Sequence, residues 1–249
     1  MSIALPIPPL ETIVPTDTAH ATPGKPAPTP VRTLGEQAYR QLRQHIIEGR
    51  YPPGVKLRVE HLKDMYGVGA GTLREALTRL VSDALVVAEG QRGFRVTPMS
   101  IADLEDVTQL RILIEVDALR ESIRHGDAVW EERVRLSFQA LSAWEQPISI
   151  EKRSAWEGHN RRFHEALISV AATPWTRLML HMLSQHSERY RHVSIGLDDS
   201  QRDVHAEHTR IFDAAMRRAD ARAALALEDH IRTTLTTVQQ APPGTLPFD

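Results

Sequence analysis

The stretch YGVGAGTLREALTRL, residues 66–80, decides the fold of the N-terminal part of this chain. It predicts the end of one helix and the start of another. Gly67 ends a short helix expected near Val59–Met65, because glycine adopts the left-handed conformation that closes helices. A second helix is expected from about Gly71 to Ser82. Its leucines recur at helical spacing and should face a core, at Leu73, Leu77 and Leu80.

The sequence before this pair predicts one further helix. It opens at Thr33, which stands three residues before Glu36 in the spacing of a capping box. Gly49 and the turn at residues 51–54 end it. Apolar residues recur on one face of this helix, at Leu34, Ala38, Leu42 and Ile46.

Two short β-like runs follow the pair, at Leu85–Ala88 and Phe94–Thr97, with residues 89–93 as the hairpin tip. Helix, helix, tight turn, helix and hairpin within about 65 residues describe a winged helix-turn-helix.

After the hairpin the pattern is helical throughout. Ser100 caps the first helix of this part, and Thr173 precedes a proline at the first position of another. Asp199 or Ser200, and then Asp220, should cap the last two helices. Further helices are expected at 127–145, 150–171, 174–195, 199–218 and 221–239. We therefore expect a mainly α protein, in which the winged helix-turn-helix precedes an antiparallel all-α bundle.

Proline content and periodicity set the expected boundaries. Eight of the sixteen prolines lie in the first 30 residues, where the backbone resists helix formation. We expect a disordered Pro-rich tail at 1–30, a DNA-binding winged helix-turn-helix at 31–98, a helical effector-binding domain at 99–240 and a loose C-terminal tail at 241–249.

Composition excludes several classes of protein. The 249 residues include no cysteine, which removes disulfides, iron–sulfur clusters and cysteine–zinc sites. No run approaches the ~18 apolar residues of a membrane-spanning helix. The N-terminus also lacks the features of a secretory signal. We therefore expect a cytoplasmic protein without a membrane partner.

Charge divides the chain into two parts. Residues 31–98 hold 11 Lys and Arg against 7 Asp and Glu, a balance of +4, whereas residues 99–249 hold 18 against 23, a balance of −5. A polyanion is therefore the expected partner of the basic part.

The second helix of a helix-turn-helix places its N-terminal side chains in the major groove. Thr72 and Arg74 should project from that helix, and Gly71 leaves room for a phosphate at its N-terminus. Arg74 can bind phosphate or make a bidentate contact to guanine, although a solvated surface role is the alternative. The hairpin tip offers contacts to the minor groove or the backbone, from Gln91, Arg92 and Gly93. Together these features predict double-stranded operator DNA as the partner.

A set of histidines in the acidic part suggests a metal site. Asn160 and His164 are four residues apart and share one helix face, while His208 and His230 lie in the middle of the last two expected helices. One amide oxygen and three imidazoles suit zinc, nickel or another first-row divalent ion. A hydrogen-bonded core or surface histidine is the alternative for each, and His205 competes with His208.

A small carboxylate effector is expected near this site, because open positions on an octahedral ion would accept one. Arg111 is flanked by apolar residues, so its guanidinium should point inward. There it either holds an effector carboxylate or pairs with Glu115. Arg189 and Tyr190 are further candidates for effector binding.

Several motifs resemble known families. The basic part resembles the winged helix of the GntR superfamily, at residues 51–57 (YPPGVKL), 66–68 (YGV), 73–80 (LREALTRL) and 90–96 (GQRGFRV). The acidic part is similar to the FCD ligand-binding domain of the FadR subfamily, at residues 111–115 (RILIE), 160–167 (NRRFHEAL), 207–211 (EHTRI) and 229–231 (DHI). Within this group the chain looks most like regulators of the CsiR/GlaR type.

The resemblance implies a homodimeric, metabolite-responsive transcriptional regulator, usually a repressor, and not an enzyme. Metal-binding FCD domains use an aspartate four residues before a histidine, then two later histidines. Asn160 replaces that aspartate with a weaker, neutral ligand. Many relatives carry an arginine at Ala70, so the operator is expected to differ.

Two other functions remain open: a metal-dependent hydrolase with an appended DNA-binding domain, and a DNA-binding protein with an inert bundle. Three histidines could activate water, but the sequence contains no HExxH motif.

Overall fold

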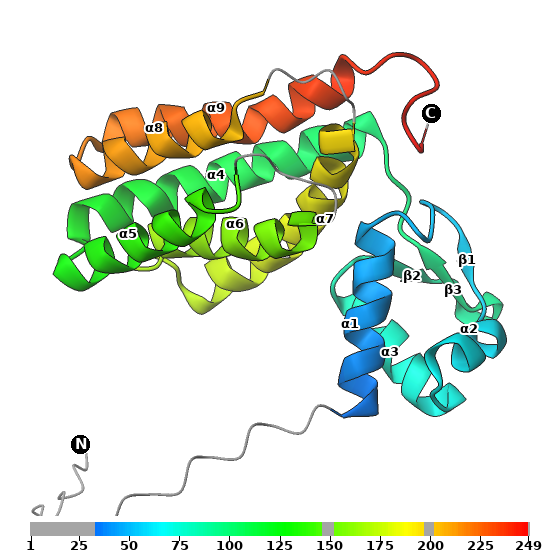
Figure 1. Cartoon of the computed structure of the whole chain (residues 1–249). Coiled ribbons are helices and arrows are strands. Elements are labelled where there is room, and N and C mark those ends of the chain that lie inside the picture. The colour runs from blue at the N-terminus through cyan, green and yellow to red at the C-terminus, as the bar shows by residue number, and fades with distance from the viewer. Residues whose placement is uncertain (1–32, 146–151, 197–201, 249) are drawn as a thin grey trace, which may run out of the picture. The chain divides into compact units, whose positions relative to one another are not determined.

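The computed structural model describes residues 33–145, 152–196 and 202–248 (Figure 1). All of the described residues belong to one compact unit, Thr33–Asp249. The expected tail at 1–30 and the expected caps Asp199 and Ser200 lie outside the described residues. None of the described helices is long and apolar enough to cross a membrane.

The first elements form the predicted winged helix-turn-helix. In chain order they are α1 (Leu34–Ile47), β1 (Lys56–Leu57), α2 (Val59–Tyr66), α3 (Ala70–Ser82), β2 (Val86–Ala88), the 3₁₀ turn η1 (Gly90–Arg92) and β3 (Phe94–Val96). β3 lies in the middle of the sheet and pairs antiparallel with both β1 and β2. β1 is not among the expected strands, because two residues are too few to show an alternating pattern.

A compact apolar core holds these elements together. The three leucines predicted to face inward from α3 are fully buried, as is Leu42 of α1. Leu34 departs from its expected place on the buried face and is 64% exposed, because it lies in the first turn of α1.

At the N-terminus of α1, one of the two hydrogen bonds of the predicted capping box is present. The Thr33 hydroxyl accepts a hydrogen bond from the Glu36 amide at 3.2 Å. The Glu36 carboxylate instead binds Arg40 and Arg79, at 2.6 and 2.8 Å. A charged guanidinium is a stronger partner for a carboxylate than a backbone amide.

The second half of the chain is a bundle of long helices (Figure 1). They are α4 (Ile101–His125), α5 (Ala128–Ser142), α6 (Arg153–Leu167), α7 (Pro174–Gly196), α8 (Val204–Met216) and α9 (Asp220–Gln239). α4 packs against α7 and α9, and α5 packs against α6 and α8. The expected helices all exist, although α8 is capped by Asp203 and α9 already begins at Asp220.

The bundle has its own apolar core around Trp130, Trp156 and Phe163, each at most 2% exposed. A smaller cluster surrounds Tyr190, and Leu246 and Phe248 from the C-terminal segment pack against it. Residues 241–248 thus contain no helix or strand, but two of their apolar side chains contact the bundle. Leu246 and Phe248 pack against the cluster around Tyr190, and the proline content of a segment does not predict such packing.

Candidate functional site

The N-terminus of α3 presents the residues expected to read DNA. Gly71 is exposed, and a Cβ built on it would meet nothing within 4 Å, so the free amides of this helix end are open to a phosphate. Arg74 is exposed and Thr72 is half-buried, whereas Leu73 between them is fully buried. The helical period therefore turns both polar side chains away from the core.

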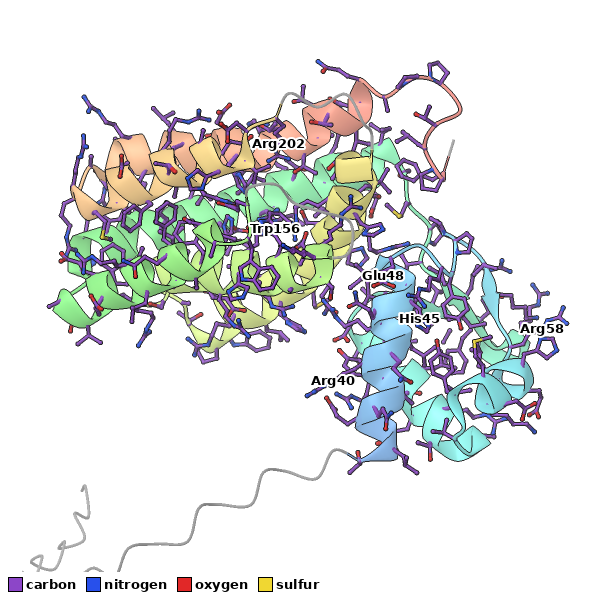
Figure 2. The ribbon with its side chains drawn as sticks, viewed as in Figure 1. Arg40, His45, Glu48, Arg58, Trp156 and Arg202 are labelled. Carbon is purple, nitrogen blue, oxygen red and sulfur yellow. The ribbon has the colours of Figure 1, made fainter. Side chains whose placement is uncertain are left out.

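Arg74 and Arg92 line one groove of about 710 Å³, together with Lys56 and Arg58. Arg58 projects outward at the start of α2 (Figure 2). Glu60, an acidic side chain of this groove, forms an ion pair with a lysine of its own helix at 2.7 Å. Lys56 and Arg58 were not among the predicted DNA contacts. The sequence signal that could have identified them is a pair of cationic residues directly before the N-terminus of a helix.

The wing depends on a glycine at its tip. Gly93 has φ 94° and ψ −136°, a conformation essentially restricted to glycine. Arg92 beside it is exposed, whereas the side chain of Gln91 lies outside the described residues. Arg95 forms an ion pair with Glu89 at 2.8 Å, which links the two sides of the wing hairpin.

Three predicted metal ligands come together inside the bundle. His164 from α6, His208 from α8 and His230 from α9 each place a ring nitrogen within 4.8 Å of the others. Nε2 of His164 and Nε2 of His208 are buried and have no hydrogen-bond partner among the described residues. Buried nitrogens without a donor leave lone pairs that an ion could use.

Asn160 lies one helical turn before His164 and is 3% exposed. Its Oδ1 is also buried without a partner in the described part of the chain. The orphaned oxygen and nitrogens fit a divalent metal ion, for which amide oxygen and imidazole are both suitable donors. His205 lies outside the cluster; its Nδ1 contacts Glu145 Oε2 at 2.9 Å and its ring stacks on Phe138.

Each imidazole of the cluster has a glutamate at its other ring nitrogen. The Nδ1 atoms of His208 and His230 lie 2.5 and 2.7 Å from the carboxylates of Glu145 and Glu207. His164 Nδ1 lies 3.6 Å from the third carboxylate, from Glu115. A proton on Nδ1 directed at a carboxylate leaves Nε2 as the metal-binding atom.

Burial and neighbouring charges shift the pKa values of His164, His230 and Glu115. Burial lowers the pKa of His164 to about 4, although the hydrogen bond that its ring donates to Glu115 opposes this shift. Burial is the largest cause that lowers the pKa of His230, and electrostatic repulsion from His208 and His164 lowers it further. Burial alone would raise the pKa of Glu115, but the Arg111 charge and the contact with His164 outweigh it and lower the pKa to about 2. A neutral His164 therefore faces an ionised Glu115 at neutral pH.

A cavity of about 1230 Å³ borders this cluster, and Asn160 and His164 both line it. Arg111 also lines it and is 6% exposed. Its Nε donates to Glu115 at 2.7 Å and its Nη1 donates to Ser187 at 2.7 Å. Of the two roles left open for Arg111, the structure shows the pairing with Glu115.

A second buried arginine was not predicted. Arg191 of α7 forms two parallel hydrogen bonds with Glu157, at 2.9 and 2.8 Å, and both residues line the cavity. Glu188, one turn earlier, also lines the cavity and accepts a hydrogen bond from Arg43 of α1 at 2.7 Å. Burial is the largest cause that raises the pKa of Glu188, and the negative charge of Glu157 raises it further.

Arg189 and Tyr190, the further candidates for effector binding, contact the segment after β3. Neither is among the described residues that line the cavity. Arg189 Nη2 donates to the carbonyl of Thr97, directly after β3, at 2.7 Å. The Tyr190 hydroxyl bonds to the backbone of Ser100 and to Asp103 at the start of α4. Both side chains therefore hold the segment that joins the wing to the bundle.

Two sequence families match this chain. Residues 34–96 match "Bacterial regulatory proteins, gntR family", and residues 106–233 match "FCD domain". A relative from Paraburkholderia xenovorans, named as the uncharacterized HTH-type transcriptional regulator BphR, is 41% identical over 84% of this chain and 87% of its own. The HTH-type transcriptional repressor GlaR of Escherichia coli is 31% identical, over 83% and 96% respectively.

Solved structures show the same fold. McbR/YncC of E. coli superposes with a TM-score of 0.68 at 19% identity, over 84% of this chain and 98% of its own. A GntR transcriptional regulator from Rhodococcus sp. RHA1 superposes with a TM-score of 0.66 at 20% identity, over 84% and 99%. The matching family models and the sequence relatives indicate a transcriptional regulator and not an enzyme, which disfavours the hydrolase alternative.

Proposed function

Since this chain belongs to the GntR family of bacterial regulatory proteins and carries an FCD domain, we propose that it is a metal-dependent, effector-responsive repressor. The observation that carries this proposal is the cluster of His164, His208 and His230 beside the 1230 Å³ cavity. Two relatives are named as transcriptional repressors, which supports repression and not activation.

The winged helix-turn-helix, proposed as residues 31–98, would bind operator DNA. α3 would enter the major groove, led by Thr72 and Arg74, and Arg92 at the wing would contact the minor groove or backbone. Arg58 and Lys56 would bind phosphates beside them. A regulator that binds operator DNA acts where the chromosome lies, so we place its action in the cytoplasm.

The bundle, proposed as residues 99–240, would bind the effector. The three histidines and Asn160 would hold a divalent ion, which would supply Lewis acidity to a ligand oxygen. The buried arginines of the cavity already have carboxylate partners. An effector carboxylate would therefore bind at the metal in preference to Arg111 or Arg191.

A second copy of the chain would complete the DNA-binding unit, because GntR regulators read two half-sites with a two-fold dimer. Apolar side chains on two adjacent helices are exposed and suit such a contact: Leu110 and Leu113 of α4 and Trp175, Leu178 and Met179 of α7. Sedimentation at micromolar concentration should give a dimer for the wild type and monomer for Leu113→Asp.

Contacts of α7 would couple the cavity to the DNA-binding half. Glu188 lines the cavity and binds Arg43 of α1, while Arg189 binds the backbone after β3. A shift of α7 or α4 on effector binding would therefore change the position of the winged helix. Such coupling is typically worth about 1–3 kcal/mol and is reciprocal.

The experiment begins with a thermal-shift screen of small mono- and dicarboxylates on Ni²⁺-loaded protein. The best acid is then titrated by calorimetry with and without a saturating operator duplex. Operator should weaken its binding by about 5- to 150-fold. Equal affinities would contradict the proposal and leave a DNA-binding protein with an uncoupled pocket.

A further inference from the structure

Three glutamates surround the proposed metal ligands, and they differ in what else they bind. Glu115 pairs with Arg111 at 2.7 Å, and Glu207 pairs with Arg202 through two bonds of 2.8 Å. Figure 2 shows Arg202 beside α8 and α9. The charges of these two glutamates are therefore already balanced by guanidinium groups.

Glu145 differs from the other two. Its side chain is fully buried, and its Oε1 and Oε2 lie 2.5 and 2.9 Å from the Nδ1 atoms of His208 and His205. The indole nitrogen of Trp156 donates to the same carboxylate at 3.4 Å. Among the described residues, no lysine or arginine forms an ion pair with it. Within the described part of the chain, aromatic and imidazole rings are therefore the side-chain partners of this buried carboxylate.

The ligand set itself carries no charge, because Asn160 is an amide and the histidines bind metal as neutral rings. An ion with two positive charges in this buried place needs negative charge nearby, since an uncompensated buried charge is costly. Glu145 supplies one such charge, at the far side of a proposed ligand ring. It also fixes that ring with Nε2 toward the other ligands.

We propose that Glu145 is a positioning residue of the metal site, which orients His208 and supplies negative charge that the ligands lack. This proposal rests on the proposed metal-dependent function. It explains how a site with an amide in place of a carboxylate ligand holds a divalent cation. The carboxylate–histidine–metal arrangement is a general device for orienting a ligand and raising its basicity.

The test measures Ni²⁺ binding to the full chain by competition with a chelator of known affinity. Glu145→Gln keeps the shape of the side chain and one acceptor but loses the charge. It should weaken Ni²⁺ binding by about 10- to 100-fold. Glu132→Gln is the matched control, because Glu132 lines the same cavity, is exposed and pairs only with Arg135 among the described residues. The control should stay within about threefold of wild type.

Two further measurements separate this role from a merely structural one. At saturating Co²⁺, Glu145→Gln should still hold one ion per chain but shift the visible absorption band, because the His208 ring is less firmly oriented. Adding Asn160→Asp to Glu145→Gln should restore tighter Ni²⁺ binding, because it returns a negative charge to the site. No recovery in the double variant would contradict the charge role.

The outcomes distinguish this inference from the function on which it rests. If the wild type binds neither Ni²⁺ nor Co²⁺, the proposed metal-dependent function fails. If the wild type binds and His208→Ala does not, but Glu145→Gln retains wild-type affinity and spectrum, only the role of Glu145 is refuted.

Discussion

The ion pair between Glu157 and Arg191 should stabilise the bundle strongly, and Glu157→Gln tests it. The two bonds measure 2.9 and 2.8 Å, and each side chain is only 10% exposed. At an effective dielectric constant of 20, two unit charges 4 Å apart attract by about 4 kcal/mol. Removing one partner from a buried pair costs about 3–5 kcal/mol, because the other charge stays buried and uncompensated. Glutamine keeps one acceptor, so we expect a loss of about 3 kcal/mol.

For a chain of this length, 1 kcal/mol corresponds to about 2–4 °C in Tm, which predicts a fall of about 6–12 °C. Urea unfolding followed by circular dichroism gives the free energy of unfolding directly. A double-mutant cycle with Arg191→Met isolates the pair, and the double variant should be more stable than the sum of the single losses predicts. Glu132→Gln, at an exposed ion pair, should change stability by no more than about 0.5 kcal/mol.

Additive single losses, or a Glu157→Gln loss below about 1 kcal/mol, would refute this reasoning. In that case the Arg191 charge would be balanced chiefly by its other neighbours. Ser187 accepts its third bond at 3.1 Å, and Glu188 lies on the same helix.

Four further predictions concern the proposed sites. Arg74→Ala should weaken operator binding by about 1–3 kcal/mol in fluorescence anisotropy at physiological salt, and unchanged affinity would remove Arg74 from the interface. Asn160→Asp should tighten Zn²⁺ binding in chelator competition, because an anionic oxygen replaces a partnerless neutral one; weaker binding would exclude this residue as a ligand. Elemental analysis should find one ion per chain in His205→Ala and none in His208→Ala, whereas the reverse would mean that the wrong histidine was assigned. Burial lowers the pKa of His186, so below pH ~6.5 the unfolded chain binds a proton that the folded chain does not, and stability falls as pH falls. His186→Gln should make this loss shallower by at most about 1.4 kcal/mol per pH unit in urea titrations at pH 7 and 5, and identical slopes would contradict it.

The sequence alone determined the helices, the hairpin of the wing and the candidate metal ligands of this protein. Leucine spacing in residues 66–80, the cap at Ser100 and the Thr173–Pro174 start are local signals, and the structure has helices at each of them. Asn160 and His164 could be nominated because residues four apart share a helix face. His208 and His230 could be nominated because they lie in the middle of the last two expected helices. His205 remained a competitor of His208, because residues three apart lie on nearly the same helix face and the exact register depends on packing.

Tertiary structure alone decided which charges meet. Glu145 stands 63 positions from His208, and Arg43 stands 145 positions from Glu188, so no local pattern pairs them. The same holds for Arg189 and Tyr190, whose helix turns them toward the segment after β3 and not into the cavity. Partners of buried charges come from whichever helices pack together, and burial then makes those pairings strong. Helix position follows from local periodicity, whereas the electrostatics of the site follow from how the helices are packed.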